Sequence, residues 1–299
     1  MTSFSLCSYF VPIYGISCSN YAKLGEFEIM SREHFLRLIQ DRTIREKISR
    51  LEHGDVFLGY NISKPFTDGG GELARQKAAD FKKLMDFCCG RHNCIPAVNL
   101  HDVSLSSLKH MHLNCDGSVS VHEEMNNNYI PKKHSIEDLI KEMKHNQSEY
   151  VWDLYSKNNK SDKEKRLINA ILWLGKAQIE LDNKIYFMEL CFALEALLQI
   201  NTNTFINPSI SYSIAIRCAM IIADQFSERR MVADNLKRLY GIRSAIAHGG
   251  EKNVSNKDCK QLFGYIVYLI NDLVHKKPWK EYSSMKDIVL EIDDRQLGK

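Results

Sequence analysis

The segment Lys184-Ile-Tyr-Phe-Met-Glu-Leu-Cys-Phe-Ala-Leu-Glu-Ala-Leu-Leu-Gln-Ile200 is apolar on nearly every side when it is drawn as a helix. A helix with this pattern is buried all round, so we expect it at the centre of a helical bundle. Working outward from it, helix-capping sequences begin at Ser135 and Ser161, and further helical patterns cover 209–224, 227–248 and 256–275. The short polar connections favour an antiparallel bundle over 131–299.

The chain before this bundle has a mixed pattern. Short β-prone stretches cover 10–16, 55–62, 95–100, 109–114 and 118–122, and helical patterns cover 31–52 and 72–89. Asn126-Asn-Asn128, followed by Pro131, is typical of a loop. The sequence therefore predicts an α+β chain with a mixed α/β domain at 1–130 and an all-α domain at 131–299.

Composition narrows the class of protein further. The 299 residues carry 40 Lys and Arg against 37 Asp and Glu, a net charge of +3, which gives no basic coat for non-specific binding of polyanions. No apolar run of about 18 residues is present, so we expect no membrane-spanning helix. The uncharged first 22 residues lack the basic start of an export signal, and the nine cysteines are scattered. We expect a cytoplasmic protein with reduced cysteines.

Three charged residues stand inside apolar helical patterns. They are Glu195 in 184–200, Arg217 in 209–224, and Arg243, which falls within an apolar stripe of 227–248. A buried charge is costly unless it is paired, so we expect Glu195 to pair with Arg243. A Glu–Arg pair that only holds the bundle together is the simpler alternative. Glu189, near the start of its helix, is expected to reach solvent.

Arg243-Ser-Ala-Ile-Ala-His248 is an Arg-x4-His motif that ends in Gly249-Gly250. The glycines indicate that the helix ends there, with His248 in its last turn, where a histidine that merely caps carbonyls is the alternative to a catalytic one. On a straight helix the side chains of Arg243 and His248 point about 140° apart. Either the last turn unwinds, or a second copy of the helix completes the site across a symmetric interface.

Three segments together resemble the Apea-like branch of the HEPN family. They are Ala193-Leu-Glu-Ala-Leu-Leu198, the lone Arg217, and Gly241-Ile-Arg-Ser-Ala-Ile-Ala-His-Gly249, within a match over about 161–275. The resemblance implies a helical bundle that forms a homodimer and cleaves RNA without a metal cofactor, with Arg243 and His248 as catalytic residues. It also implies a role in anti-phage defence. Ser244 follows the arginine where the family frequently has Asn.

The two residue types suit this chemistry. Histidine is suited to act as general base or acid on the 2′-hydroxyl and the leaving 5′-oxygen, and arginine to bind the phosphate in a bidentate manner. We expect an endoribonuclease that leaves 2′,3′-cyclic phosphate and 5′-hydroxyl ends, with residues 1–130 sensing a phage-derived or protein trigger or restraining activity. The alternative is a non-catalytic HEPN dimer that binds RNA or a partner protein, with Glu195, Arg217 and Arg243 as a structural network.

The weaker candidates for RNA contacts lie on the expected helix over 227–248, which also carries Arg243 and His248. Arg229, Arg230, Lys237 and Arg238 are either an RNA path or a solvated face, and Tyr240 either stacks a base or belongs to the core or an interface. In the first domain, the basic helix over 31–52 is predicted to be a solvated face, with an RNA or trigger surface as the alternative.

A group of cysteines and histidines raises the question of zinc. Cys88, Cys89, His92 and Cys94 include suitable ligand types, but their spacing is not that of two Cys-x2-Cys pairs. We therefore predict no metal and keep these four residues as weak candidates.

Overall fold

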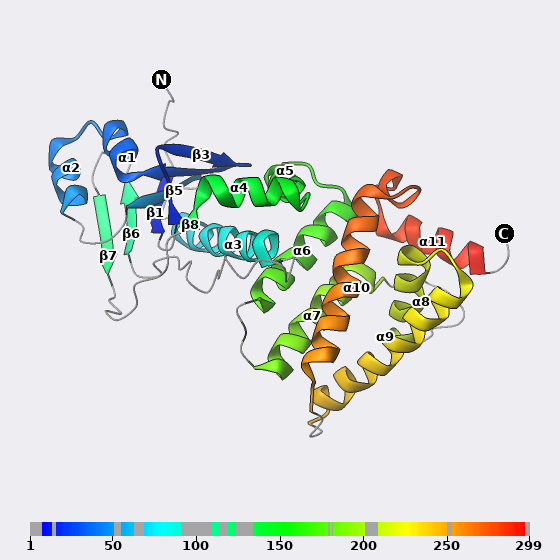
Figure 1. The fold of residues 1–299 in the computed structure, drawn as a ribbon. Coiled ribbons are helices and arrows are strands. Elements are labelled where there is room, and N and C mark those ends of the chain that lie inside the picture. The colour runs from blue at the N-terminus through cyan, green and yellow to red at the C-terminus, as the bar shows by residue number, and fades with distance from the viewer. Residues whose placement is uncertain are drawn as a thin grey trace. The chain divides into compact units, whose positions relative to one another are not determined.

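The computed structural model describes residues 8–13, 16–50, 55–62, 69–90, 109–113, 119–123, 134–178, 180, 182–200, 209–249 and 253–296, with the backbone alone at 109–113 and 119–123. Contacts divide the chain into unit 1, Met1–Ser156, and unit 2, Lys157–Lys299. Unit 1 contains strands and helices and the described part of unit 2 is helical, so the expected mixed α+β class is confirmed (Figure 1).

Unit 1 is built on a six-stranded sheet in the order β3-β4-β5-β1-β6-β7. The strands are β1 (Ser8–Ile13), β3 (Tyr21–Leu24), β4 (Phe27–Ser31), β5 (Val56–Asn61), β6 (Lys109–Leu113) and β7 (Val119–Glu123), and every neighbouring pair is antiparallel. A second, parallel pair joins β2 (Ile16–Ser17) to β8 (His134–Ser135). Successive side chains of a strand point to opposite faces, and β1 and β5 are buried almost throughout, so both faces of the sheet are covered at these strands.

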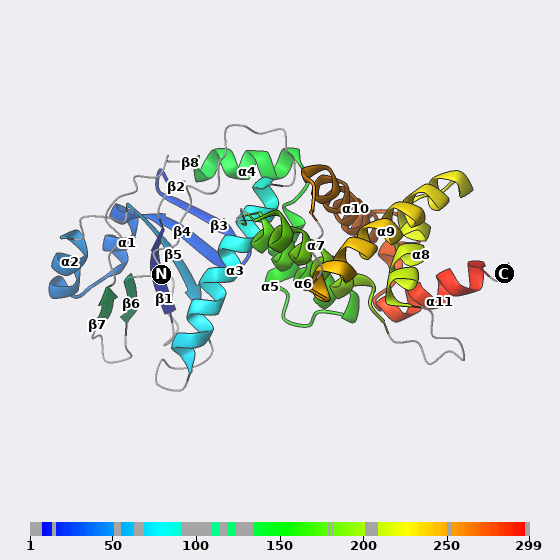
Figure 2. The ribbon, with the colours of Figure 1, turned by 90° about the horizontal axis from the view of Figure 1, so that it is seen from below.

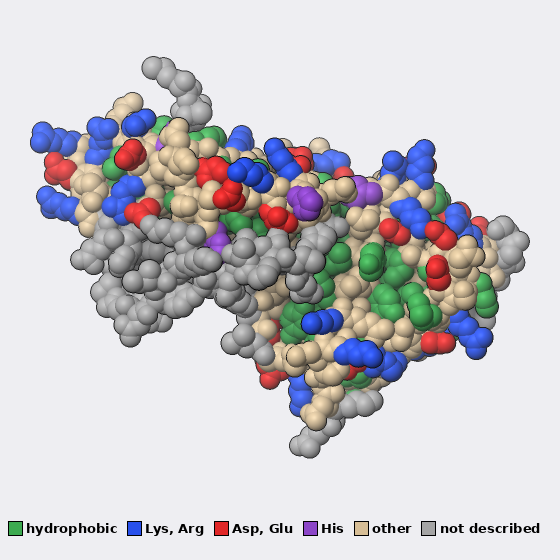
Figure 3. All heavy atoms as spheres, viewed as in Figure 1, with side chains coloured by type: hydrophobic (Ala, Val, Ile, Leu, Met, Phe, Trp, Pro, Cys, Tyr) green, Lys and Arg blue, Asp and Glu red, His purple; other side chains and the backbone are tan. Residues whose placement is uncertain are grey.

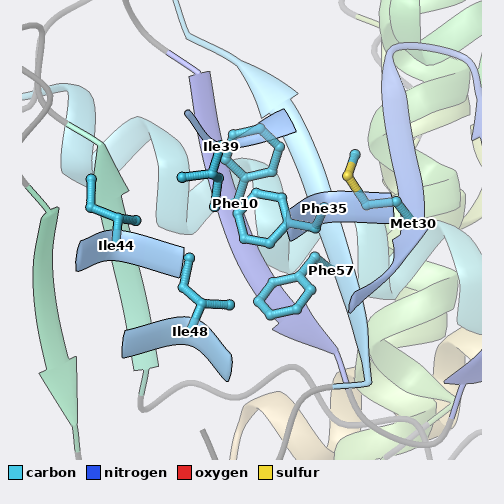
Figure 4. Packing of buried hydrophobic residues seen from close by; sticks show 7 residues of the cluster. All are labelled: Phe10, Met30, Phe35, Ile39, Ile44, Ile48 and Phe57. Atoms are coloured by element: carbon cyan, nitrogen blue, oxygen red, sulfur yellow. The ribbon is translucent and has the colours of Figure 1, made fainter. Parts of the chain in front are cut away.

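One face of the sheet is covered by α1 (Arg32–Leu38) and α2 (Arg42–Ser49). Their apolar residues meet the sheet in one cluster (Figure 4), which contains Phe10, Met30, Phe35, Ile39, Ile44, Ile48 and Phe57. The Phe35 ring lies 4.4 Å from the Phe57 ring and 4.6 Å from the Phe10 ring, between centroids. This contact fixes α1 on the sheet and leaves its polar side in solvent.

The opposite face carries α3 (Gly70–Gly90), which Figure 2 shows from below, and α4 (Ile136–His145) and α5 (Tyr150–Ser156) pack against α3. Phe27 of the sheet contacts Phe81 of α3 and Trp152 of α5, with ring centroids 5.1 and 6.0 Å apart. Because α5 completes this core, unit 1 continues to Ser156, later than the boundary at 130 that the loop composition suggests. The β3–β4 turn packs here too: Gly25 has φ +56, and a Cβ on it would lie 2.5 Å from the Trp152 carbonyl oxygen.

Residues 31–52 form two helices where the sequence pattern suggests one. Ile39 and Gln40 separate them, and Asp41 caps the second because its carboxylate accepts a hydrogen bond from the Ile44 amide at 3.0 Å. The hairpin of β3 and β4 is a further difference from the expected strands. The strand expected at 95–100 lies outside the described residues.

Unit 2 contains α6 (Asp162–Ala177), α7 (Asn183–Leu198), α8 (Ile210–Ile222), α9 (Phe226–Ala247), α10 (Asn256–His275), a 3-10 helix (Trp279–Glu281) and α11 (Met285–Gln296). The expectation for 184–200 is confirmed, since α7 packs against α6, α8, α9 and α10. The capping sequence at Ser161 is also confirmed: its hydroxyl accepts from the Glu164 amide at 3.3 Å. None of the helices in the described part of the chain combines the length and apolar character needed to span a bilayer.

A buried lysine ties α6 to the end of α10 and to the 3-10 helix that follows it. Lys163 of α6 is 6% exposed, and its Nζ donates to the carbonyl oxygens of Trp279 and Lys280 at 3.0 Å and of Leu273 at 3.4 Å. Burial lowers the pKa of this ammonium group. Hydrogen bonds from Lys163 thereby satisfy carbonyls in the last turn of α10 and in the 3-10 helix.

Candidate functional site

The Arg-x4-His motif lies at the C-terminal end of α9. Val232, Leu236, Leu239 and Ile242 bury the apolar stripe of this helix against unit 2, as the spacing predicts. The His248 amide still donates to the Ser244 carbonyl at 3.1 Å, so the helical hydrogen bonding continues to the end of the motif. Gly249 then turns the chain with φ +75.

Arg243 and Glu195 form an ion pair between α9 and α7, which confirms the expected pairing. Arg243 Nε lies 3.1 Å from Glu195 Oε1, and Arg243 Nη2 donates to Oε2 in a long hydrogen bond of 3.5 Å. The side chains are 31% and 14% exposed, respectively. Nε and Oε1 are buried, and the contact between them lacks hydrogen-bond geometry. The pair is therefore held mainly by charge.

Tyr240 and Cys191 lie beside this ion pair. Tyr240, one turn before Arg243, is 4% exposed, and its hydroxyl has no hydrogen-bond partner among the described residues. Burial, with help from Cys191 and Glu195, holds the pKa of Tyr240 well above its ordinary value. Burial and Glu195 likewise raise the pKa of the Cys191 thiol. Tyr240 is thus a protonated core residue whose ring is not presented to an RNA base.

His248 has a different environment from Arg243. Its side chain is exposed, and the described part of the chain offers it no hydrogen bond or ion pair. Because the helix remains regular, the five-residue step from Arg243 turns the two side chains about 140° apart. The first of the two sequence alternatives, an unwound last turn, is therefore absent in one chain. Ser244 is also exposed and follows Arg243 on the helix.

Arg217 of α8 is a structural anchor. It is 7% exposed, and its Nη1 donates to the carbonyl oxygens of Leu198 at 2.8 Å and Ile200 at 3.2 Å. Leu198 is the last residue of α7, and Ile200 follows it. Burial lowers the pKa of this guanidinium. Arg166 of α6 donates to Ala196 in the same last turn at 3.0 Å. Two arginines therefore satisfy the carbonyls at the end of the central helix, and sequence reasoning identified only one of them.

Two of the weaker RNA-binding candidates are engaged inside unit 2. Arg229 Nε donates to the Ala223 carbonyl at 2.9 Å. Arg238 contacts Asp258 of α10 at 2.6 Å and donates to Gln261 at 2.8 Å. These contacts join α9 to the preceding loop and to α10, so the two arginines serve the bundle.

The other two cations remain at the surface. Arg230 and Lys237 share Asp234, at 3.9 and 3.7 Å, and all three side chains are more than 40% exposed. Lys237 also lies over the Tyr212 ring, 5.2 Å from its centroid. Exposed ion pairs of this kind contribute little to stability, so both cations are accessible to an anion.

Glu189 corrects one expectation about α7. It is 4% exposed rather than solvated, and its Oε1 pairs with Lys176 Nζ of α6 at 2.9 Å. The apolar pattern around Glu189 is the signal for this burial, because it is the same on all sides of the helix. Glu189 and Glu195 are thus both partnered carboxylates between helices.

The cysteines proposed as weak zinc ligands are only partly described. Cys88 and Cys89 are buried on α3, where the Cys88 thiol donates to the Ser148 carbonyl at 3.8 Å. Burial raises the pKa of Cys89. His92 and Cys94 lie outside the described residues, and the described residues alone contain no group of three metal-binding side chains.

Comparisons of the chain with family models, with curated proteins and with solved structures gave no match. The function is therefore inferred from the residues at the end of α9 and their partners.

Proposed function

We propose that unit 2 is a HEPN-type, metal-independent endoribonuclease that acts as a homodimer in defence against phage. One observation carries the proposal: Arg243 is oriented by Glu195 at the end of α9, and His248, on the same regular helix, is exposed and unpartnered among the described residues. A cation fixed in place and a free imidazole are the two groups that RNA cleavage through the 2′-hydroxyl requires.

Arg243 keeps donors available for a phosphate. A guanidinium has five N–H donors, and Glu195 faces only the Nε and Nη2 atoms of Arg243. The remaining donors bind two oxygens of the scissile phosphate in a bidentate manner. Glu195 thereby orients the guanidinium, and Ser244 next to it is a supporting polar group.

His248 moves the protons. As general base it takes the proton of the 2′-hydroxyl, and the 2′-oxygen then attacks the phosphorus. The bond from phosphorus to the 5′-oxygen breaks, and that oxygen leaves as a hydroxyl after receiving a proton from an imidazolium. The products are a 2′,3′-cyclic phosphate and a 5′-hydroxyl, and no metal is consumed or required.

The regular helix supports a composite site. Since one chain directs Arg243 and His248 about 140° apart, a symmetric second copy brings Arg243 of one chain to His248 of the other. In this arrangement the cleft contains two arginines and two histidines.

A non-catalytic HEPN dimer that binds RNA or a partner protein is the second candidate. It is favoured by the observation that Arg243 and Arg217 are both engaged by groups of their own unit. In that case the Glu195–Arg243 pair serves only to hold α7 against α9.

Cleavage of total RNA in EDTA separates the two candidates. We expect His248→Ala to lower the rate by about 10²-fold or more, as the loss of a general acid or base does. The matched control is His145→Ala, because His145 is also an exposed histidine in the last turn of a helix, α4. If neither the wild type nor the control cleaves RNA, the binding dimer is favoured. If His248→Ala cleaves RNA as fast as the wild type, the proposed mechanism is contradicted.

Mixing two inactive variants tests the composite site. If Arg243 and His248 come from different chains, a heterodimer of Arg243→Ala with His248→Ala retains one intact site. An equimolar mixture then recovers about a quarter of the wild-type activity, because about half of the dimers are mixed. No recovery, with mixed dimers present by native mass spectrometry, shows that the site does not combine one residue from each chain.

A further inference from the structure

The positive charge of unit 1 is concentrated on α1 and α2. Residues 32–50 carry six Lys and Arg against three Asp and Glu, whereas the other described residues of unit 1 carry eight against twelve. Figure 3 shows Lys and Arg side chains gathered over these two helices. A near-neutral chain therefore contains a local basic surface on an otherwise acidic unit.

Three of these cations have no partner among the described residues: Arg37, Lys47 and Arg50 are exposed and make no ion pair or side-chain hydrogen bond there. By contrast, Arg42 pairs with Glu46 at 3.2 Å, and Arg45 Nε donates to the Leu36 carbonyl at 2.9 Å. Arg45 thereby joins α2 to α1, and the charge of Arg42 is balanced by Glu46. The three unpaired cations are left for an external anion.

An aromatic pair adjoins the same helices. Tyr21, at the start of the edge strand β3, is 42% exposed, and its ring centroid lies 5.4 Å from that of His34 on α1. Asn20 holds the imidazole through a 2.9 Å hydrogen bond to Nδ1. Figures 1 and 2 both show α1 between β3 and α2, so the aromatic pair lies at one edge of the cationic surface.

We propose that this basic face, defined by Arg37, Lys47 and Arg50 with Tyr21 and His34, binds single-stranded RNA. The cations contact the phosphodiester backbone, and a base stacks on the exposed Tyr21 ring. The combination of a charged track with an aromatic platform is the recognition chemistry of single-stranded nucleic acid. The choice of RNA rests on the function proposed for unit 2, and unit 1 then holds the substrate that unit 2 cuts.

The residue types favour a nucleic acid over an acidic protein. Five of the six cations on 32–50 are arginines, whose planar guanidinium matches two phosphate oxygens, while a lysine offers a single point charge. An acidic peptide has no flat, unpaired base to stack on Tyr21. A duplex hides its bases in the same way, so the exposed ring favours a single strand.

Fluorescence anisotropy with a 5′-fluorescein-labelled oligouridylate tests the proposal across a range of salt concentrations. All proteins carry His248→Ala so that the probe stays intact. The test variant adds Arg37→Ala, Lys47→Ala and Arg50→Ala. The control removes three exposed cations elsewhere in unit 1, through Arg75→Ala, Lys141→Ala and Lys144→Ala.

We expect the test variant to reduce the slope of log K against log salt by about 2, since each lost phosphate contact on a single strand contributes about 0.7. The control leaves the slope unchanged. Tyr21→Ala raises Kd about tenfold at fixed salt without changing the slope, because stacking involves no counterion release. Tyr268→Ala, which removes another exposed tyrosine, leaves Kd unchanged.

If the test and control variants have equal salt slopes, and the far-UV circular dichroism of both is at wild-type level, the proposal that the basic face binds RNA is overturned. If polyglutamate at matched charge competes as well as unlabelled oligouridylate, the face is assigned to an acidic protein. If a duplex binds more tightly than the single strand, the proposed stacking of a base on Tyr21 is overturned. The readout is binding and not cleavage. If the wild-type chain cuts no RNA, the proposed function of unit 2 is contradicted, and the binding result for unit 1 is unaffected.

Discussion

The Glu195–Arg243 pair gives the sharpest prediction about unit 2. Replacing Glu195 with Gln keeps the size and shape of the side chain but removes the charge that faces Arg243. Replacing Arg243 with Met leaves the Glu195 carboxylate beside the Tyr240 hydroxyl and the Cys191 thiol, which offer no compensating cation. Each single change strands one partially buried charge, and the double change strands neither.

The magnitude follows from the geometry. At the 3.1 Å separation of Nε and Oε1, Coulomb attraction is about 5 kcal/mol at an effective dielectric constant of about 20. Desolvation of both groups, and water that reaches the 31% exposed Arg243 side chain, offset most of it. We expect each single variant to lower the free energy of unfolding by about 2 kcal/mol, with a coupling energy of about 1–2 kcal/mol.

A double-mutant cycle measures this coupling through urea unfolding followed by far-UV circular dichroism. The matched control is a cycle on Arg230 and Asp234, an ion pair on α9 at 3.9 Å whose side chains are 74% and 61% exposed. That cycle is expected to give a coupling of about 0.3–0.5 kcal/mol. If the Glu195–Arg243 cycle is additive within about 0.5 kcal/mol, the pair does not hold Arg243, and the orientation argued for the phosphate ligand is refuted.

Two further predictions concern buried charges. Lys163→Met leaves three carbonyls without their donor, so we expect the free energy of unfolding of unit 2, measured in urea, to fall by about 3 kcal/mol. The control Lys165→Met, on the exposed side of α6, changes this free energy little. A fall of less than about 1 kcal/mol for Lys163→Met contradicts the proposed anchoring role. In unit 1, burial outweighs the Lys82 contact and raises the pKa of Asp86 to about 6 from its ordinary value of 3.8. Because the folded state then binds this proton more tightly, the free energy of unfolding falls by up to about 3 kcal/mol as pH rises from about 4 to about 6. Asp86→Asn should flatten that part of a pH series of urea titrations, and an unchanged slope contradicts the assignment.

The helices of unit 2 were predictable because their signals are local. Ser161 marks the start of α6, and the apolar character of 184–200 identifies the central helix. The same kind of cap at Ser135 marks the start of α4, which belongs to unit 1. The α9 stripe also places Arg243 toward α7, and this is why its pairing with Glu195 follows from the sequence. By contrast, α11 was not among the expected helices, although its buried residues Met285, Ile288, Val289 and Ile292 have the i, i+3, i+4, i+7 spacing that indicates an amphipathic helix.

The parts that the sequence leaves open depend on tertiary contacts. The break between α1 and α2 needs Ile39 to turn into the sheet cluster, and the charge pattern over 31–52 contains no sign of it. The sequence also does not identify the partner of Glu189, which is Lys176 of a neighbouring helix. At the candidate site, the sequence leaves open whether the last turn of the helix unwinds, and the hydrogen bond from the His248 amide to the Ser244 carbonyl shows that it does not in one chain. That a second copy completes the site stays a proposal.

The uneven distribution of charge in unit 1 gives this unit an electric dipole whose positive end lies on α1 and α2. A polyanion exerts a torque on such a dipole before any contact forms, so most encounters begin with the same side facing the ligand. The orienting effect acts over roughly 8 Å at physiological ionic strength and weakens as salt is added. An isoelectric point averages over the whole chain and does not report this property.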